Sequence, residues 1–272
     1  MSTAYVETTV LTDILLKPNS PKQKRARAAL DRFENTLLPV YSIKEWKAGP
    51  LKRFAFIHNK FVQTGSFADT LTAISALGPP YLHRTSTEAI AAAAQVSKRS
   101  PQTYAATNDR ELADSYRLAL YSLIVRSWEK RRRITTQVVH ELPCYIEAAP
   151  HREKNGLLNL RPEECDRDQE CCLADELRAE PRLLEALRDA IPETSAKPEH
   201  RRRRRALKRL ISHPRDKVDR DLCRDLGDAI FAFFCPKEAV ILTTNLSDIA
   251  PLAKAVGKTA QSPAETVGLT ET

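Results

Sequence analysis

The chain has 272 residues, with 43 lysines and arginines against 35 aspartates and glutamates, and so a formal net charge of +8. Apolar residues make up 42% of the chain, enough for a sizeable core. The chain has only seven glycines, and such a low number disfavours a loop-rich all-β fold. No apolar run approaches the roughly 18 residues of a membrane span, and the N-terminus lacks the basic start of a signal peptide. Six cysteines without such a signal are typical of reduced thiols, so we expect a cytoplasmic protein with no membrane partner. The positive charge favours an anionic partner such as nucleic acid, and is equally compatible with plain solubility.

The first 80 residues predict two strands, each followed by a helix. The apolar run Ala4–Glu7 has strand length, and the apolar residues after it recur on one helical face as far as Lys17. Leu37–Tyr41 predicts the second strand. Ser42 and Glu45, three residues apart, fit a capping box at the start of the next helix.

Residues 81–215 differ in character, because every element predicted there is a helix. Helices are predicted over residues 87–98, 109–133, 162–179, 181–190 and 199–212. We therefore expect two parts: an α/β core from residues 1–80 and 216–272, and a helical insertion from residues 81–215.

Residues 219–258 predict a helix–strand–helix unit. Its first helix, Asp219–Phe234, has an apolar stripe on one face and three aspartates on another. Ala239–Leu242 has strand length. Thr243 and Asn245 follow it, where a buried parallel strand would open onto a loop.

Acidic or amide side chains lie near the ends of the predicted strands. Glu7 ends the first strand, Glu45 begins the helix after the second, and Asp228 lies on the helix before the third. Asn245 and Asp248 follow that third strand. In an open α/β sheet, sites form beyond the carboxyl ends of the strands, and clustered carboxylates are the ligands that Mg²⁺ and Mn²⁺ prefer. The pattern therefore predicts a divalent-metal site of the kind that activates water and clamps a phosphodiester.

Three segments resemble the PIN-domain nucleases, a family that includes the VapC-like toxins of toxin–antitoxin pairs. They are YVETTVL at Tyr5–Leu11, SIKEW at Ser42–Trp46, and the stretch from Gly227 to Gly257 that reads GDAIFAFF…AVILTTNLSDIAPLAKAVG. The last is the most specific: an aspartate, a small apolar helix, a strand, then Thr-x-Asn with an aspartate three residues after the asparagine. The resemblance covers residues 4–77 and 219–267, less than half of the chain.

The resemblance implies a PIN-like three-layer α/β/α sandwich around a parallel sheet. It also implies a Mg²⁺- or Mn²⁺-dependent endoribonuclease that cleaves RNA phosphodiester bonds. Glu7, Glu45 and Asp228 match the first three acids of the family, with glutamate at a first position that is normally aspartate. Asn245 occupies the place of the fourth acid, with Asp248 nearby.

Supporting roles follow for three further residues. Asp225, one turn before Asp228, is expected to assist at the metal, and Thr243 is expected to support the site. Two roles stay open for Thr9, either orienting a carboxylate at the metal or capping the helix that follows.

Basic residues in the insertion are candidates for binding RNA phosphates. They are Arg201, Arg202, Arg203, Arg204, Arg205 and Lys208. The alternative is a solvated helix start.

Two other functions stay open. Glu7 and Asn245 differ from the acids that the PIN-domain family has at these two positions. The chain is therefore also compatible with a catalytically degenerate PIN-like module that binds RNA or a protein partner. The insertion is also a candidate surface for an antitoxin-like or regulatory protein.

Overall fold

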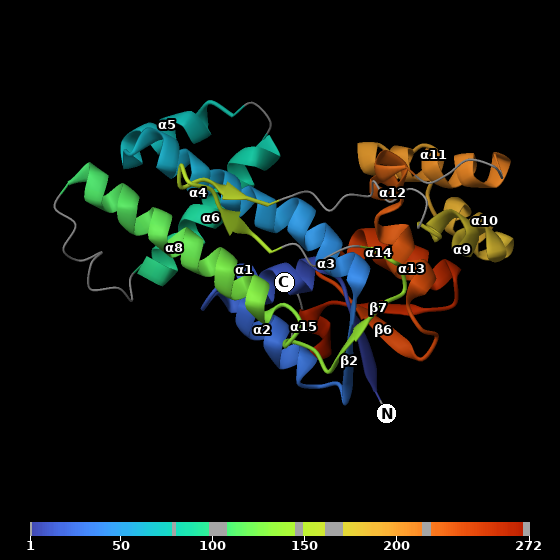
Figure 1. The fold of residues 1–272 in the computed structure, drawn as a ribbon. Coiled ribbons are helices and arrows are strands. Elements are labelled where there is room, and N and C mark those ends of the chain that lie inside the picture. The colour runs from blue at the N-terminus through green and yellow to red at the C-terminus, as the bar shows by residue number, and fades with distance from the viewer. Residues whose placement is uncertain are drawn as a thin grey trace.

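The computed structural model describes residues 2–77, 80–97, 108–144, 149–160, 171–213 and 219–268. Its centre is a five-stranded parallel sheet in the order β3–β2–β1–β6–β7 (Figure 1). The strands are β1 (Thr3–Val6), β2 (Asn35–Pro39), β3 (Gln137–Val139), β6 (Ala239–Leu242) and β7 (Thr259–Gln261). The predicted α/β class with a parallel sheet is confirmed.

Helices cover both faces of the sheet, because successive strand residues point to opposite faces and each face carries its own apolar core. Ala4 and Val6 of β1 belong to one core, and Tyr5 between them belongs to the other. The first core is covered by α1 (Thr8–Leu16), α2 (Pro21–Leu30), α3 (Val40–Trp46), the π-helical turn η1 (Lys47–Leu51), α4 (Lys52–Thr64), α5 (Phe67–Ser75), α6 (Pro80–Ser97) and α8 (Asp109–Lys130). The second is covered by α9 (Leu173–Ala179), α10 (Pro181–Asp189), α11 (Pro198–Ser212), α12 (Arg220–Leu226), α13 (Asp228–Phe234) and α14 (Leu246–Ala255). Figure 1 shows the blue-to-green helices and the orange-to-red helices on either side of the strands.

Two smaller elements lie outside these layers. An antiparallel pair, β4 (His151–Arg152) with β5 (Leu158–Asn159), packs on α4. The short helix α15 (Pro263–Thr266) packs on α2. None of the helices in the described ranges is long and apolar enough to cross a membrane.

The helix predicted over Asp219–Phe234 is in fact two helices. Gly227 separates α12 from α13 with φ 39° and ψ −112°, a backbone conformation that residues with a side chain rarely adopt. The three aspartates of that stretch therefore do not share one continuous helical face. Asp228 instead becomes the first residue of α13.

The segment 81–215 is not wholly a helical insertion. β3 pairs in parallel with β2 and adds an edge strand to the main sheet. The hydroxyl and backbone of Thr136 join Thr36 across this pair. Leu120 and Ile124 of α8 are buried in the same core as β1. This part of the segment thus belongs to the α/β body, and the expectation that it lies outside the body is wrong.

One predicted helix falls partly beyond the described ranges. The helix expected from residue 162 has its described part in α9, which begins at Leu173. Residues 161–170 lie outside the described residues.

Candidate functional site

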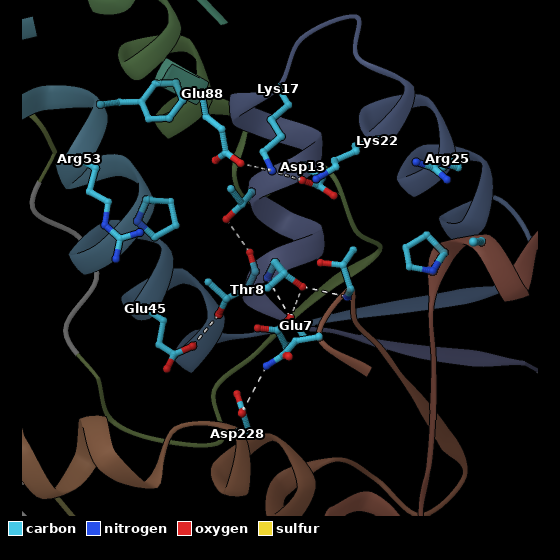
Figure 2. A pocket seen from close by; sticks show the side chains of 18 residues that line it. Glu7, Thr8, Asp13, Lys17, Lys22, Arg25, Glu45, Arg53, Glu88 and Asp228 are labelled. Atoms are coloured by element: carbon cyan, nitrogen blue, oxygen red, sulfur yellow. Dashed lines mark hydrogen bonds and ion pairs between the residues drawn. The ribbon is translucent and has the colours of Figure 1, made fainter. Parts of the chain in front are cut away.

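The carboxyl ends of β1 and β6 lie where the strand order reverses. From β1 the chain crosses to β2 on one side of β1 and later to β6 on the other side. Such a reversal opens a crevice beyond the strand ends, and α/β sheets place their sites there. A cavity of about 550 Å³ occupies this place, and Glu7, Glu45 and Asp228 all line it. Figure 2 shows these three carboxylates at the cavity, Glu7 from the junction of β1 and α1, Glu45 from α3 and Asp228 from α13.

Glu7 follows β1 directly and is almost fully buried, at 3% exposure. It caps α1, because its Oε2 accepts a hydrogen bond from the backbone N–H of Thr9 at 2.9 Å. The hydroxyls of Thr9 and Thr243 donate to the same oxygen, Thr243 at 3.0 Å. Burial raises the pKa of Glu7 to about 8, and the charges of Asp228 and Glu45 add to the rise. Glu7 is therefore a largely protonated carboxylic acid at neutral pH.

Glu45 does not form the predicted capping box, because α3 begins two residues before Ser42, at Val40. The Ser42 hydroxyl donates instead to the carbonyl of Val6 at 2.7 Å, which ties α3 to the end of β1. Glu45 accepts a hydrogen bond from the Thr8 hydroxyl at 2.8 Å. Burial and the charge of Asp228 raise its pKa to about 7. The carboxyl group is thus held at the cavity rather than at a helix end.

Asp228 lies opposite these two glutamates and is held by a cation. Nη2 of Arg203, from α11, lies 2.5 Å from its Oδ2, and the side chains of Arg203 and Asp228 are 7% and 16% exposed. Asn245 Nδ2 lies 3.5 Å from the same oxygen. Burial raises the pKa of Asp228 despite the opposing effect of Arg203.

Two other predicted acids point elsewhere. Asp248 contacts Nζ of Lys197 at 2.5 Å and Nε2 of His200 at 3.2 Å, and these contacts outweigh partial burial and lower its pKa. Asp225 lies 3.6 Å from Arg202. Neither acid lines the cavity. Asn245 lines it, and its backbone N–H donates to Thr243 at 2.9 Å.

The arginine run lies on α11, and much of it contacts the protein itself. Arg203 is buried against Asp228, so its predicted contact with an RNA phosphate is wrong. Contacts within the protein also hold Arg201 (carbonyls of Ser195 and Ala196), Arg202 (Asp225) and Arg204 (carbonyls of Arg188 and Ile191, and Glu193). Arg205 and Lys208 are exposed, and for them RNA contact stays a prediction.

Sequence reasoning missed two residues that hold the site. Thr8 was not singled out, although its hydroxyl positions Glu45. Arg203 was predicted only as one of the arginines that bind RNA phosphates. The sequence does indicate that Arg203 is buried, because Ala206, Leu207 and Leu210 follow it at helical spacing and form the buried face of α11.

The residues around the cavity fit a divalent cation by their chemistry. As they stand, no three His, Cys, Asp or Glu side chains in the described ranges lie close enough together to hold one metal ion. Yet Glu7, Glu45 and Asp228 supply hard oxygen ligands to one cavity, where Asp228 raises the pKa of both glutamates and Glu45 raises that of Glu7. A cation among them would relieve this repulsion once the side chains had closed on it.

Glu7 and Glu45 are the two glutamates of the YVETTVL and SIKEW segments, and Asp228 opens the third segment that resembles the PIN-domain nucleases. Comparison with known proteins gives no match to a protein-family model, a curated protein or a solved structure.

Proposed function

We propose that this protein is a Mg²⁺- or Mn²⁺-dependent endoribonuclease with a PIN-like fold. One observation carries the proposal: Glu7, Glu45 and Asp228, from three distant parts of the sequence, line one cavity at the switch point of a parallel sheet. Asp228 raises the pKa of both glutamates, and residues with strongly shifted pKa values cluster at functional sites. The five-stranded parallel sheet with helices on both faces is compatible with the PIN-like sandwich.

The chain's own residues would fix the geometry of the reaction. Thr9 and Thr243 hold Oε2 of Glu7, and no described residue donates to Oε1. Thr8 holds Glu45, whose pKa of about 7 suits it to accept a proton at its carboxylate near neutral pH. Arg203 fixes the orientation of Asp228.

When bound by these carboxylates, a divalent cation supplies Lewis-acid polarisation of a phosphoryl oxygen and an acidified water. Glu7, Glu45 and Asp228 are the residues that would hold it, with Asn245 at the edge of the cavity. Asp248 is assigned to the contact with α11 rather than to the metal.

The test is cleavage of a generic single-stranded RNA in Mn²⁺ by three proteins: wild type, Asp228→Asn and Asp225→Asn. Asp228→Asn removes a cavity carboxylate, whereas Asp225→Asn makes the same chemical change outside the cavity. We expect Asp228→Asn to lose at least about 100-fold in rate, as for loss of a catalytic electrostatic group, and Asp225→Asn to keep nearly full activity. Equal activity in wild type and Asp228→Asn would remove Asp228 from the site.

A second candidate is a non-catalytic module that binds RNA. It is favoured by the ion pair between Arg203 and Asp228 and by the lack of a ready-made three-acid metal group in the described ranges. Titration with Mn²⁺ separates the two functions. Salt-dependent RNA binding without any Mn²⁺ binding would favour the module.

A further inference from the structure

The cavity that holds the three carboxylates is also lined by four cations. They are Lys17, Lys22, Arg25 and Arg53. Lys17 is neutralised locally, because its Nζ lies 2.8 Å from Asp13 and 3.7 Å from Glu88, which also line the cavity. Lys22 and Arg25 of α2 supply positive charge to the same cavity.

Lys22 and Arg25 form a pair on one wall of the cavity. They are three residues apart on α2, so they share a helical face, and both side chains are exposed. Neither has an ion-pair partner in the part of the chain that the structure describes. Figure 2 shows both on one side of Glu7, with Arg53 of α4 on the opposite side and Glu45 and Asp228 between or below.

Cations beside the three carboxylates would reduce the electrostatic repulsion between the cavity and an RNA substrate. Three clustered carboxylates repel a polyanion, so a substrate with a phosphate backbone needs cations beside them. Four of the five arginines in the run at positions 201–205 of α11 already contact groups of the protein itself. Lys22 and Arg25, by contrast, line the cavity beside the carboxylates.

We infer that a single strand of RNA crosses the cavity and runs along α2. Lys22 and Arg25 bind its phosphates on one side of the carboxylates. The scissile phosphodiester lies over Glu7, Glu45 and Asp228. This assignment rests on the proposed ribonuclease function and locates its substrate on α2 rather than on α11.

The test is the salt dependence of RNA binding without cleavage. A short fluorescein-labelled single-stranded RNA is titrated with protein in EDTA, over about 50–200 mM KCl, and affinity is followed by fluorescence anisotropy. Each phosphate contact on a single strand contributes about 0.7 to the slope of log affinity against log salt, so Lys22→Ala/Arg25→Ala should lower the slope by about 1.4.

The comparison variant is Arg205→Ala/Lys208→Ala, which removes the same charge from the two exposed α11 positions also predicted to contact RNA and so sets the α2 assignment against that prediction. Its slope should equal that of wild type. The assignment is overturned if the α2 double variant keeps the wild-type slope, or if the α11 double variant loses as much. Far-ultraviolet circular dichroism and a thermal melt confirm that each variant folds.

The outcomes for binding and for catalysis are separate. If the α2 double variant loses slope while wild type fails to cleave RNA in Mn²⁺, the substrate path stands and the ribonuclease proposal falls. If wild type cleaves RNA and the α2 double variant keeps its slope, the path falls and the ribonuclease proposal stands.

Discussion

The guanidinium of Arg203 lies 2.5 Å from the carboxylate of Asp228, and both groups are largely buried. Arg203 comes from α11, in the segment between the two parts that resemble PIN-domain nucleases, and Asp228 is the third acid of that resemblance. The contact ties the segment to the cavity. It also explains how a carboxylate is tolerated beside Glu7 and Glu45, since a buried charge needs a partner.

Breaking this pair is expected to destabilise the fold. Arg203→Met leaves Asp228 without its cation, and removal of one partner of a buried ion pair costs on the order of 3 kcal/mol. Arg205→Met, the same change at an exposed position two residues away, should stay within about 0.5 kcal/mol of wild type. Urea unfolding followed by circular dichroism measures both.

The double variant Arg203→Met/Asp228→Asn gives a second check. It removes both charges, so it should be more stable than Arg203→Met alone. Equal stability of Arg203→Met and Arg205→Met would mean that the ion pair contributes nothing.

The buried glutamates predict an unusual pH dependence for the metal-free protein. The folded-state pKa of Glu7 is raised from 4.5 to about 8, and that of Glu45 from 4.5 to about 7. Between the unfolded-state pKa of 4.5 and these folded-state values, the folded protein binds more protons than the unfolded chain. The free energy of unfolding therefore falls as pH rises from about 4.5 to about 8. Glu7→Gln should flatten this fall.

The fall is measured as the urea midpoint at several pH values in the presence of a chelator. Glu34→Gln, at an exposed position, is the control and should keep the wild-type slope. A slope that Glu7→Gln leaves unchanged would show that Glu7 is not protonated in the folded state.

The turn at Gly227 is expected to be essential for the position of Asp228. A residue with a side chain at φ 39° costs about 1–2 kcal/mol, and a Cβ there would meet the carbonyl oxygen of Arg224 at 3.2 Å. Gly227→Ala should therefore lower stability and lower RNA cleavage as well. Gly49→Ala is the control, because no neighbouring atom lies within 4 Å of the Cβ it adds. If Gly227→Ala cleaves RNA as Gly49→Ala does, the turn does not set the site.

The strands that position the site were predictable because both their faces are buried. Ala239–Leu242 was predicted with its observed bounds, and the first strand was one residue off at each end, because Glu7 caps α1 instead of continuing the strand. Fully buried parallel strands leave short apolar runs that differ clearly from the neighbouring helices.

The missed elements depend on contacts between distant segments. β3 has three residues and is held by its pairing with β2, which no local pattern reveals. The capping box was wrong because Ser42 finds a partner in Val6, 36 residues away. The break at Gly227 lay within a convincing helical pattern, since one glycine does not by itself end a helix. Arg203 lay within a run of arginines whose side chains point in different directions around a helix.

The central claim, that Glu7, Glu45 and Asp228 form one metal site, is tested most directly by equilibrium binding of Mn²⁺ followed by electron paramagnetic resonance. Wild type at pH 8 should bind Mn²⁺ at a site that weakens at pH 6, because the glutamates must lose protons to bind. Glu7→Gln, Glu45→Gln and Asp228→Asn should each weaken that same site by at least about 10-fold, as loss of a ligand-supporting group does, and Asp225→Asn should not. Wild-type binding of Mn²⁺ that is no tighter than that of the three cavity variants would contradict the claim.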